Sequence, residues 1–135
     1  MATFTKVTLY TDRDGRAKWR EEEVPLAEGT PQAMLSAVFP SAGYQLRHSP
    51  AGFRSPWHCT PRPQWVFILG GEMEIGLRDG STRVFRPGEH FYSADVLPEG
   101  QVFDSQLHGH WSAQRGNRPL VTLFVKAARP EENSS

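Results

Sequence analysis

The sequence is short of cysteine, of net charge and of long apolar runs, and each shortage excludes a class of protein. Cys59 is the only cysteine among 135 residues, so an internal disulfide is impossible and a reducing, cytoplasmic setting is favoured. The 15 basic and 15 acidic residues give a formal net charge of zero. This balance argues against a general electrostatic attraction to nucleic acid or to anionic lipid.

Signals for secretion, membrane insertion and DNA binding are also missing from the sequence. The N-terminal residues Met-Ala-Thr-Phe-Thr-Lys lack the basic region and apolar stretch of a secretory signal. No apolar run approaches the length that spans a membrane, and no helix-turn-helix pattern is present. We therefore expect neither a membrane nor a nucleic acid among the partners of this protein.

Turn residues between short apolar runs are what the sequence does contain. Its 12 glycines and 11 prolines suit an all-β protein with many turns. A chain of 135 residues is long enough for one domain with a single core and too short for two. We expect one domain over residues 1–126, followed by a flexible polar tail over residues 127–135.

Alternating apolar and polar residues, separated by turn residues, predict most of the strands. Residues 12–15 and 79–80 have the composition of hairpin turns. Residues 32–39 have the length of a strand, with a short helix as the alternative because several of them favour helix. Residues 112–119 are interpreted as a connection. The predicted strands cover residues 4–10, 19–26, 43–48, 53–58, 64–69, 72–77, 82–84, 90–93 and 120–125.

Residues 57–72 place polar side chains at strand spacing in front of one of the most apolar runs in the chain. In an extended strand His58 and Thr60 point to one face, and Cys59 points to the other. Cys59 therefore has no base on its own face, which a nucleophile would need. We expect it to be a buried, small apolar side chain.

A further strand follows the two prolines of this stretch. Gln64, Val66 and Ile68 share one of its faces. The opposite face carries Trp65, Phe67 and Leu69. If Gln64 faces inward together with His58 and Thr60, the three side chains form one polar cluster inside an apolar cavity.

The same stretch resembles the first motif of the cupin superfamily, which reads His-x-His, three or four residues, Glu, six residues, Gly. Here the spacing is His58-x-Thr60, three residues, Gln64, six residues and Gly71. Thr60 stands in place of the second histidine, and Gln64 stands in place of the carboxylate. The resemblance implies an all-β fold, the double-stranded β-helix or jelly-roll barrel of a small single-domain cupin.

Residues 80–88, followed by an aromatic strand, resemble the start of the second cupin motif, which continues to Pro-x-Gly-x-x-His. Here Ala94 occupies the proline position, and residues 95–109 intervene before a histidine at 110. Such a lengthened second motif is similar to that of some small one-domain cupins, and the resemblance implies that His110 is the motif histidine. His108 is the alternative, because both histidines would face inward in an extended segment.

The resemblance implies that His58, Gln64 and His110 converge at the barrel mouth as ligands of a divalent transition metal such as iron, nickel, zinc or manganese. Because Gln64 is neutral, metal affinity should be lower than with a carboxylate. Asp104 or His108 would make up the loss if the long segment folds inward. Further residues predicted to line the pocket or lie beside it are Thr60, Trp65 and His90.

Three functional classes follow from these residues. The first is a metal-dependent enzyme of the dioxygenase, lyase or isomerase type, acting on a compact organic molecule. The second is a metal-free enzyme in which His58 and His110 act as general acid and base for an isomerisation or cyclisation. The third is a ligand-binding or sensor module without turnover. Gln64 in place of Glu favours the second and third classes, whereas the two histidines favour the first.

Two further expectations concern a positive charge that would bind the substrate and a second copy of the chain. Arg47, Arg54 and Arg62 are candidates for a cation near the barrel mouth that would bind a substrate carboxylate. The cupin resemblance also implies a homodimer that shares the N-terminal strands and one barrel face. A sheet with exposed aromatic side chains and open edges gives a physical motive for such pairing.

Overall fold

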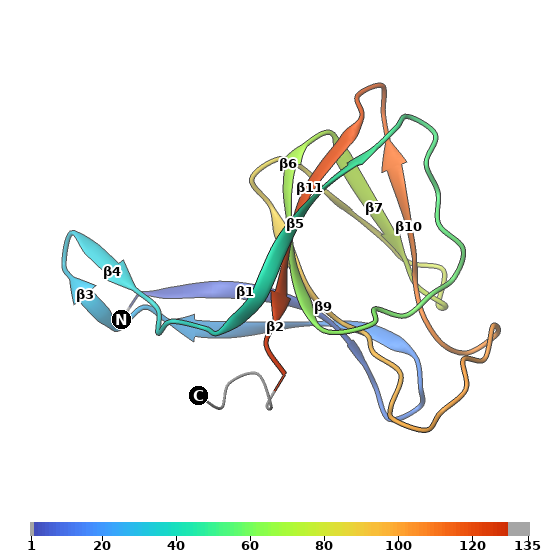
Figure 1. Cartoon of the computed structure of the whole chain (residues 1–135), viewed down its shortest axis with the longest axis horizontal. Helices are drawn as coiled ribbons and strands as arrows, with labels where there is room; N and C mark the ends of the chain where they lie inside the picture. Colours follow the sequence, from blue (N-terminus) through green and yellow to red (C-terminus); the bar gives the residue numbers. More distant parts are fainter. Residues whose placement is uncertain (1, 130–135) are drawn as a thin grey trace.

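The computed structural model describes residues 2–129, which form an all-β fold of two facing sheets (Figure 1). Strand order is β2-β1-β9-β6-β11-β5 in the six-stranded sheet and β10-β7-β8 in the three-stranded sheet, and β3 and β4 form a separate hairpin. Residues 2–129 contain no helix, and hence none long and apolar enough to cross a membrane. The strands are β1 (Thr3–Thr11), β2 (Ala17–Pro25), β3 (Glu28–Thr30), β4 (Ala33–Leu35), β5 (Ser41–Ser49), β6 (Gln64–Gly70), β7 (Glu72–Gly76), β8 (Thr82–Phe85), β9 (His90–Ala94), β10 (Trp111–Arg115) and β11 (Leu120–Ala127).

The core lies between the two sheets and follows the alternation of side chains along the strands. On β6 of the large sheet Val66 and Ile68 are buried, and on β7 of the small sheet Met73 and Ile75 are buried against the same cluster. Removing each such side chain from water contributes about 1.5–3 kcal/mol. The predicted all-β fold and the inward face of residues 64–68 are confirmed.

The chain passes from the large sheet to the small one at Gly71, the last residue of the first motif. Its backbone is in the left-handed region, at φ 72°. A Cβ atom at this position would lie 2.4 Å from the carbonyl oxygen of Pro119. Only glycine fits this crossing, which explains why the motif ends on this residue.

The predicted N-terminal hairpin is confirmed, since β1 pairs with β2 from Thr3–Pro25 to Thr11–Ala17. One other prediction is wrong, and another holds only in part. Residues 53–58 form no strand, because Pro56 has no N–H to donate, and only isolated bridges form at Arg54 and His58. Residues 32–39 contain only the short strand β4, which pairs with β3, and the alternative helix does not form either.

The strand β10 lies where the sequence predicted a connection. Its residues Ser112, Ala113 and Gln114 are all buried, although two of them are polar. The Gln114 amide is satisfied by backbone groups, for example by donating to the carbonyl of Arg118 over 2.6 Å. A buried strand with polar residues gives no apolar alternation, so the pattern could not reveal it.

The predicted boundary between domain and tail lies close to the end of β11, which runs to Ala127. Residues 130–135 of the predicted tail lie outside the described residues.

Candidate functional site

Two backbone hydrogen bonds hold His58 beside His110 and so join the two motifs. The N–H of His58 donates to the carbonyl of His110 over 2.9 Å, and the N–H of His110 donates back over 3.0 Å. Gly109 permits this approach, because its φ is 89° and a Cβ atom there would lie 2.6 Å from the carbonyl oxygen of His58. As a result the two imidazole rings have centroids 4.6 Å apart.

The imidazole of His110 is oriented by a buried carboxylate. Its Nδ1 lies 2.8 Å from Oδ2 of Asp95, whose side chain is completely buried. The other carboxylate oxygen accepts a hydrogen bond from Oγ1 of Thr11 over 2.7 Å. The carboxylate accepts a hydrogen bond from Nδ1–H, so the proton stays on Nδ1 and Nε2 is the nitrogen available to a ligand.

The imidazole of His58 is oriented by backbone and hydroxyl groups. Its Nδ1 lies 2.9 Å from the carbonyl oxygen of Pro56 and 3.2 Å from Oγ of Ser55. Because a carbonyl can only accept, Nδ1 carries the proton and Nε2 carries the lone pair. Burial lowers the pKa of His58, the bond to Pro56 partly offsets this, and the nearby His110 lowers the pKa further. The ring is therefore neutral at pH 7.

Both histidines line one cavity of about 70 Å³ between the sheets. Thr60 and Gln64 line it as well, so the structure brings these four predicted residues together. Thr60 is tied into the wall, because its hydroxyl bonds that of Ser93 and its N–H donates to the carbonyl of Asp95 over 2.8 Å. The polar residues that line the cavity are Arg47, His58, Thr60, Gln64, Ser93, His110 and Ser112.

Trp65 and His90, predicted to lie in or beside the pocket, are on the outer face of the large sheet. Trp65 alternates with the inward-facing Val66, and its ring centroid lies 5.6 Å from that of His90. His90 accepts a hydrogen bond from the N–H of Val7 over 3.3 Å and packs on Phe4. These contacts make both residues part of the outer wall and keep them out of the cavity.

Asp104 and His108 also lie away from the cavity. Asp104 is exposed, and its N–H donates to Nδ1 of His108 over 2.9 Å. His108 is buried beside the N-terminal hairpin, where a Cβ atom on Gly15 would lie 3.4 Å from its ring. The expectation that His108 and His110 share a face is wrong, because the positive φ of Gly109 between them interrupts the extended alternation.

Asp95 is the site residue that sequence reasoning missed. It was treated as the first residue of the insertion, yet it continues the alternation of β9, in which Phe91, Ser93 and Asp95 are all buried. An acidic residue on the inward face of a strand is costly unless it is paired. That period of two was the signal that would have found it.

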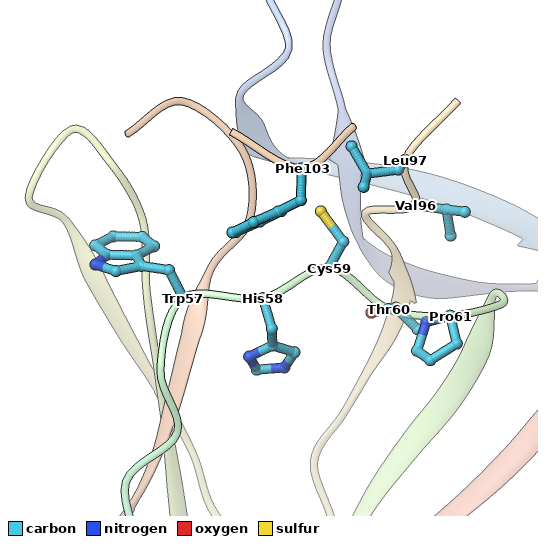
Figure 2. Close-up of a pocket in the computed structure, with 8 residues that line it drawn as sticks. All are labelled: Trp57, His58, Cys59, Thr60, Pro61, Val96, Leu97 and Phe103. Atoms are coloured by element: carbon cyan, nitrogen blue, oxygen red, sulfur yellow. The ribbon is translucent and has the colours of Figure 1, made fainter. Parts of the chain in front are cut away.

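A second cavity, of about 330 Å³, lies on the other side of residues 57–61. Figure 2 shows the thiol of Cys59 pointing towards Phe103 and Leu97, while the ring of His58 points the opposite way, as the strand period predicted. Burial raises the pKa of Cys59 to about 11. The thiol therefore stays protonated at neutral pH and is a poor nucleophile.

The donor set of the smaller cavity fits a metal of modest affinity. Both imidazoles have Nδ1 engaged, and a carboxylate behind a metal-ligating histidine is a common arrangement. The third donor would be the amide oxygen of Gln64, whose side chain makes no hydrogen bond within residues 2–129. In the same part of the chain no three His, Cys, Asp or Glu side chains are grouped to hold a metal.

Comparisons with known proteins give one relative in sequence and several in structure. No protein-family model matches the chain. It is 32% identical over 78 residues to a 3-hydroxyanthranilate 3,4-dioxygenase of Jannaschia sp. (strain CCS1), a match that covers 58% of this chain and 38% of that protein. The chain thus spans well under half of the length of the curated relative that it matches.

Among solved structures, the chain is similar to the Schizosaccharomyces pombe Cnp3 cupin domain, at 17% identity and a TM-score of 0.49, with 98% of this chain and 88% of that one covered. It is also similar to the DMSP lyase DddQ from Ruegeria pomeroyi DSS-3, at 24% identity and a TM-score of 0.45, with 65% and 39% covered. The structure itself defines an all-β protein of two facing sheets, in which the stretch that resembles the first cupin motif is paired through His58 with His110.

Proposed function

We propose that this chain is a small cupin enzyme that acts on a compact organic molecule, with a divalent transition metal held by His58, His110 and the amide oxygen of Gln64. The observation that carries the proposal is the orientation of the two imidazoles. Each has its Nδ1 occupied by an acceptor, and both rings line the same small cavity, so that Nε2 is the nitrogen left for a ligand. Two preorganised lone pairs of this kind are what a transition metal requires.

The residues around the ligands have defined tasks in this proposal. Asp95 keeps the proton of His110 at Nδ1, and Thr11 fixes the carboxylate in turn. The carbonyl of Pro56 does the same for His58. When bound, the metal supplies Lewis acidity towards a substrate oxygen. The sequence relative with a dioxygenase name supports an assay of 3-hydroxyanthranilate among the first substrates tested.

Metal content of the purified protein tests this proposal. The protein is refilled in turn with iron, nickel, zinc and manganese, and the bound metal is measured for the wild type, His58→Ala and His110→Ala. We expect about one metal per chain in the wild type and loss in both variants. Metal that survives both substitutions would show that the ligands are other residues, and a folded protein that takes up none of the four would refute metal dependence.

The second candidate is metal-free acid and base catalysis by the same two histidines. The pairing of His110 with Asp95 favours it, because the carboxylate on Nδ1 holds the ring in place and leaves Nε2 for proton transfer. The neutral Gln64 favours it too, since a carboxylate ligand is missing. Turnover that persists after complete chelation would support this candidate over the first. A ligand that is carried through purification without turnover would instead support a binding or sensor module.

The outer surface of the large sheet supports a homodimer. Eight large apolar side chains on this surface and on the adjoining segment 26–40 are between 40% and 92% exposed, and we call them the outer apolar face. At roughly 200 Å² per large side chain, their exposed parts amount to about 1,000 Å². That area matches the ~800 Å² per partner of a standard interface and exceeds what monomers usually expose. The residues are Phe4, Met34, Leu35, Val38, Phe39, Tyr44, Leu46 and Leu69.

A second copy of the chain is the occupant that this surface suits. The β3–β4 hairpin projects away from the sheets (Figure 1), and both of its strands are exposed. Beside it, an apolar cavity of about 380 Å³ is lined by residues such as Phe39, Trp65 and Phe67. Each protomer thus offers both a projecting apolar segment and an apolar recess, which is the self-complementarity that a two-fold interface requires.

A further inference from the structure

Arg47 faces the cavity that contains the two histidines. On β5, Tyr44 and Leu46 point to the outer surface of the large sheet, and Arg47, on the alternate face of the strand, is an exposed residue at the edge of the cavity. Arg47 lines the cavity together with His58 and Gln64. Its guanidinium lies over the ring of Phe53, 4.5 Å from the centroid, and this stacking holds the cation in place.

The positive charge of Arg47 has no carboxylate partner within residues 2–129. Arg86 and Arg115, by contrast, form ion pairs with glutamates of β7. The carboxylate closest to the histidine pair is that of Asp95, and both of its oxygens are already bonded, one to His110 and one to a threonine. The other polar groups of the cavity are hydroxyls, an amide and the two imidazoles, and none of them is a carboxylate.

A cation that has no carboxylate partner, at the edge of a cavity without carboxylates, favours a negatively charged ligand. Guanidinium and carboxylate groups match in a bidentate geometry, and a charge-assisted pair of this kind is stronger than a neutral hydrogen bond. The cavity of about 70 Å³ has room for a carboxylate, because a water molecule takes up roughly 30 Å³. The rest of a larger molecule would extend past the exposed side of Arg47.

We propose that Arg47 binds the carboxylate of the substrate and so restricts the enzyme to small organic carboxylates. This inference rests on the proposed function, since it takes the His58–His110 cavity as the site where the substrate is bound. It names the substrate class of that site and the residue that selects it.

Benzoate and benzamide form a matched pair of probes, because they have nearly the same shape and differ in charge. Their affinities are measured by calorimetry for the purified wild type, Arg47→Gln, Arg47→Lys and Arg54→Gln. Arg54 is the matched control, since its guanidinium also lies over a ring, 4.3 Å from the centroid of Trp111, but does not line the cavity. We expect Arg47→Gln to weaken benzoate binding about tenfold or more, Arg47→Lys to keep part of it, and Arg54→Gln to change it less than about twofold. Benzamide binding should not depend on Arg47.

The outcomes separate this inference from the proposed function. If the metal is lost in His58→Ala but benzoate binds Arg47→Gln as well as the wild type, the inference fails and the metal site stands. If benzoate binding depends on Arg47 while no metal binds, the carboxylate site stands and the metal proposal fails. Absence of binding of benzoate, pyruvate and malonate to the wild type would overturn the inference. Inorganic phosphate bound more tightly than any carboxylate would overturn the assignment of a carboxylate.

Discussion

The carboxylate of Asp95 accepts a hydrogen bond from Nδ1 of His110 over 2.8 Å, and both side chains are buried. The two residues lie on different segments, one at the end of β9 and one just before β10. The bond therefore links the orientation of the imidazole to the way in which residues 95–109 fold. Whatever chemistry the cavity performs, the position of the free Nε2 depends on this carboxylate.

Asp95→Asn should weaken metal binding by about 10–100-fold, because the amide no longer fixes the ring tautomer or raises its basicity. The free energy of unfolding should fall by about 1–3 kcal/mol, since a buried hydrogen-bond network is disturbed. Competition against a zinc chelator and urea unfolding measure the two effects. Asp104→Asn is the control, because that side chain is exposed and lies away from the cavity. Equal metal affinity in both variants would show that His110 is not a ligand.

Gln64→Glu should raise metal affinity by about tenfold or more, because a carboxylate adds the negative charge that the amide lacks. Titration with zinc in the presence of a competing chelator gives the affinity. Gln106→Glu adds the same charge at an exposed position outside the cavity and should have no effect. An unchanged affinity in Gln64→Glu would remove Gln64 from the ligand set.

Acidification should destabilise the metal-free protein through His58. Burial lowers the pKa of this histidine in the folded state below its ordinary value of 6.5, so the unfolded chain binds more protons as the pH falls through that value. Stability is therefore full above about pH 6.5 and declines below it. Melting temperatures between pH 5 and 8 should fall less steeply for His58→Gln than for the wild type.

Two other histidines bear on this experiment, one as a second contributor to the slope and one as a control. Burial also lowers the pKa of His90, so part of the slope remains in His58→Gln. His48 is exposed on the outer side of β5, and His48→Gln should keep the slope of the wild type. Identical slopes in all three proteins would contradict the neutral, buried state of His58.

Gly109→Ala should separate the two histidines. A left-handed φ costs a non-glycine residue about 1–3 kcal/mol, and the new Cβ atom would also collide with the carbonyl oxygen of His58 at 2.6 Å. Gly100→Ala is a matched control, because its φ is similar, at 81°, but no atom lies within 4 Å of the added Cβ. We expect the control to lose stability only, and Gly109→Ala to lose metal binding as well. Urea unfolding measures the stability of both variants, and metal titration measures their metal affinity.

Leu46→Lys should convert the proposed dimer into a monomer. A charge in the middle of the outer apolar face would have to be buried unpaired in the interface, which is strongly unfavourable. Light scattering gives the mass in solution. Val102→Lys changes an even more exposed apolar residue on the loop after β9, outside the outer apolar face, and this variant should remain dimeric. A wild type that is monomeric at all concentrations would refute the dimer.

Local alternation in the sequence determined the faces of β6 and β7 and the shared direction of His58 and Thr60. These features depend on neighbours along one strand, where a period of two is a geometric property of extended backbone. The last residue of the motif was likewise determined locally, because the crossing at Gly71 admits no other residue.

Tertiary structure alone decided which histidine completes the site and what orients it. His110 reaches His58 because Gly109 turns the backbone between His108 and His110, and the same turn directs His108 towards the N-terminal hairpin. The bond to Asp95 spans 15 positions and depends on how the intervening segment packs. Strand β10 was equally invisible, since Ser112 bonds Ser55 and the Gln114 amide bonds both Gly52 and carbonyls just after the strand. The physical reason is the same in each case: contacts between distant segments leave no periodic trace in the sequence.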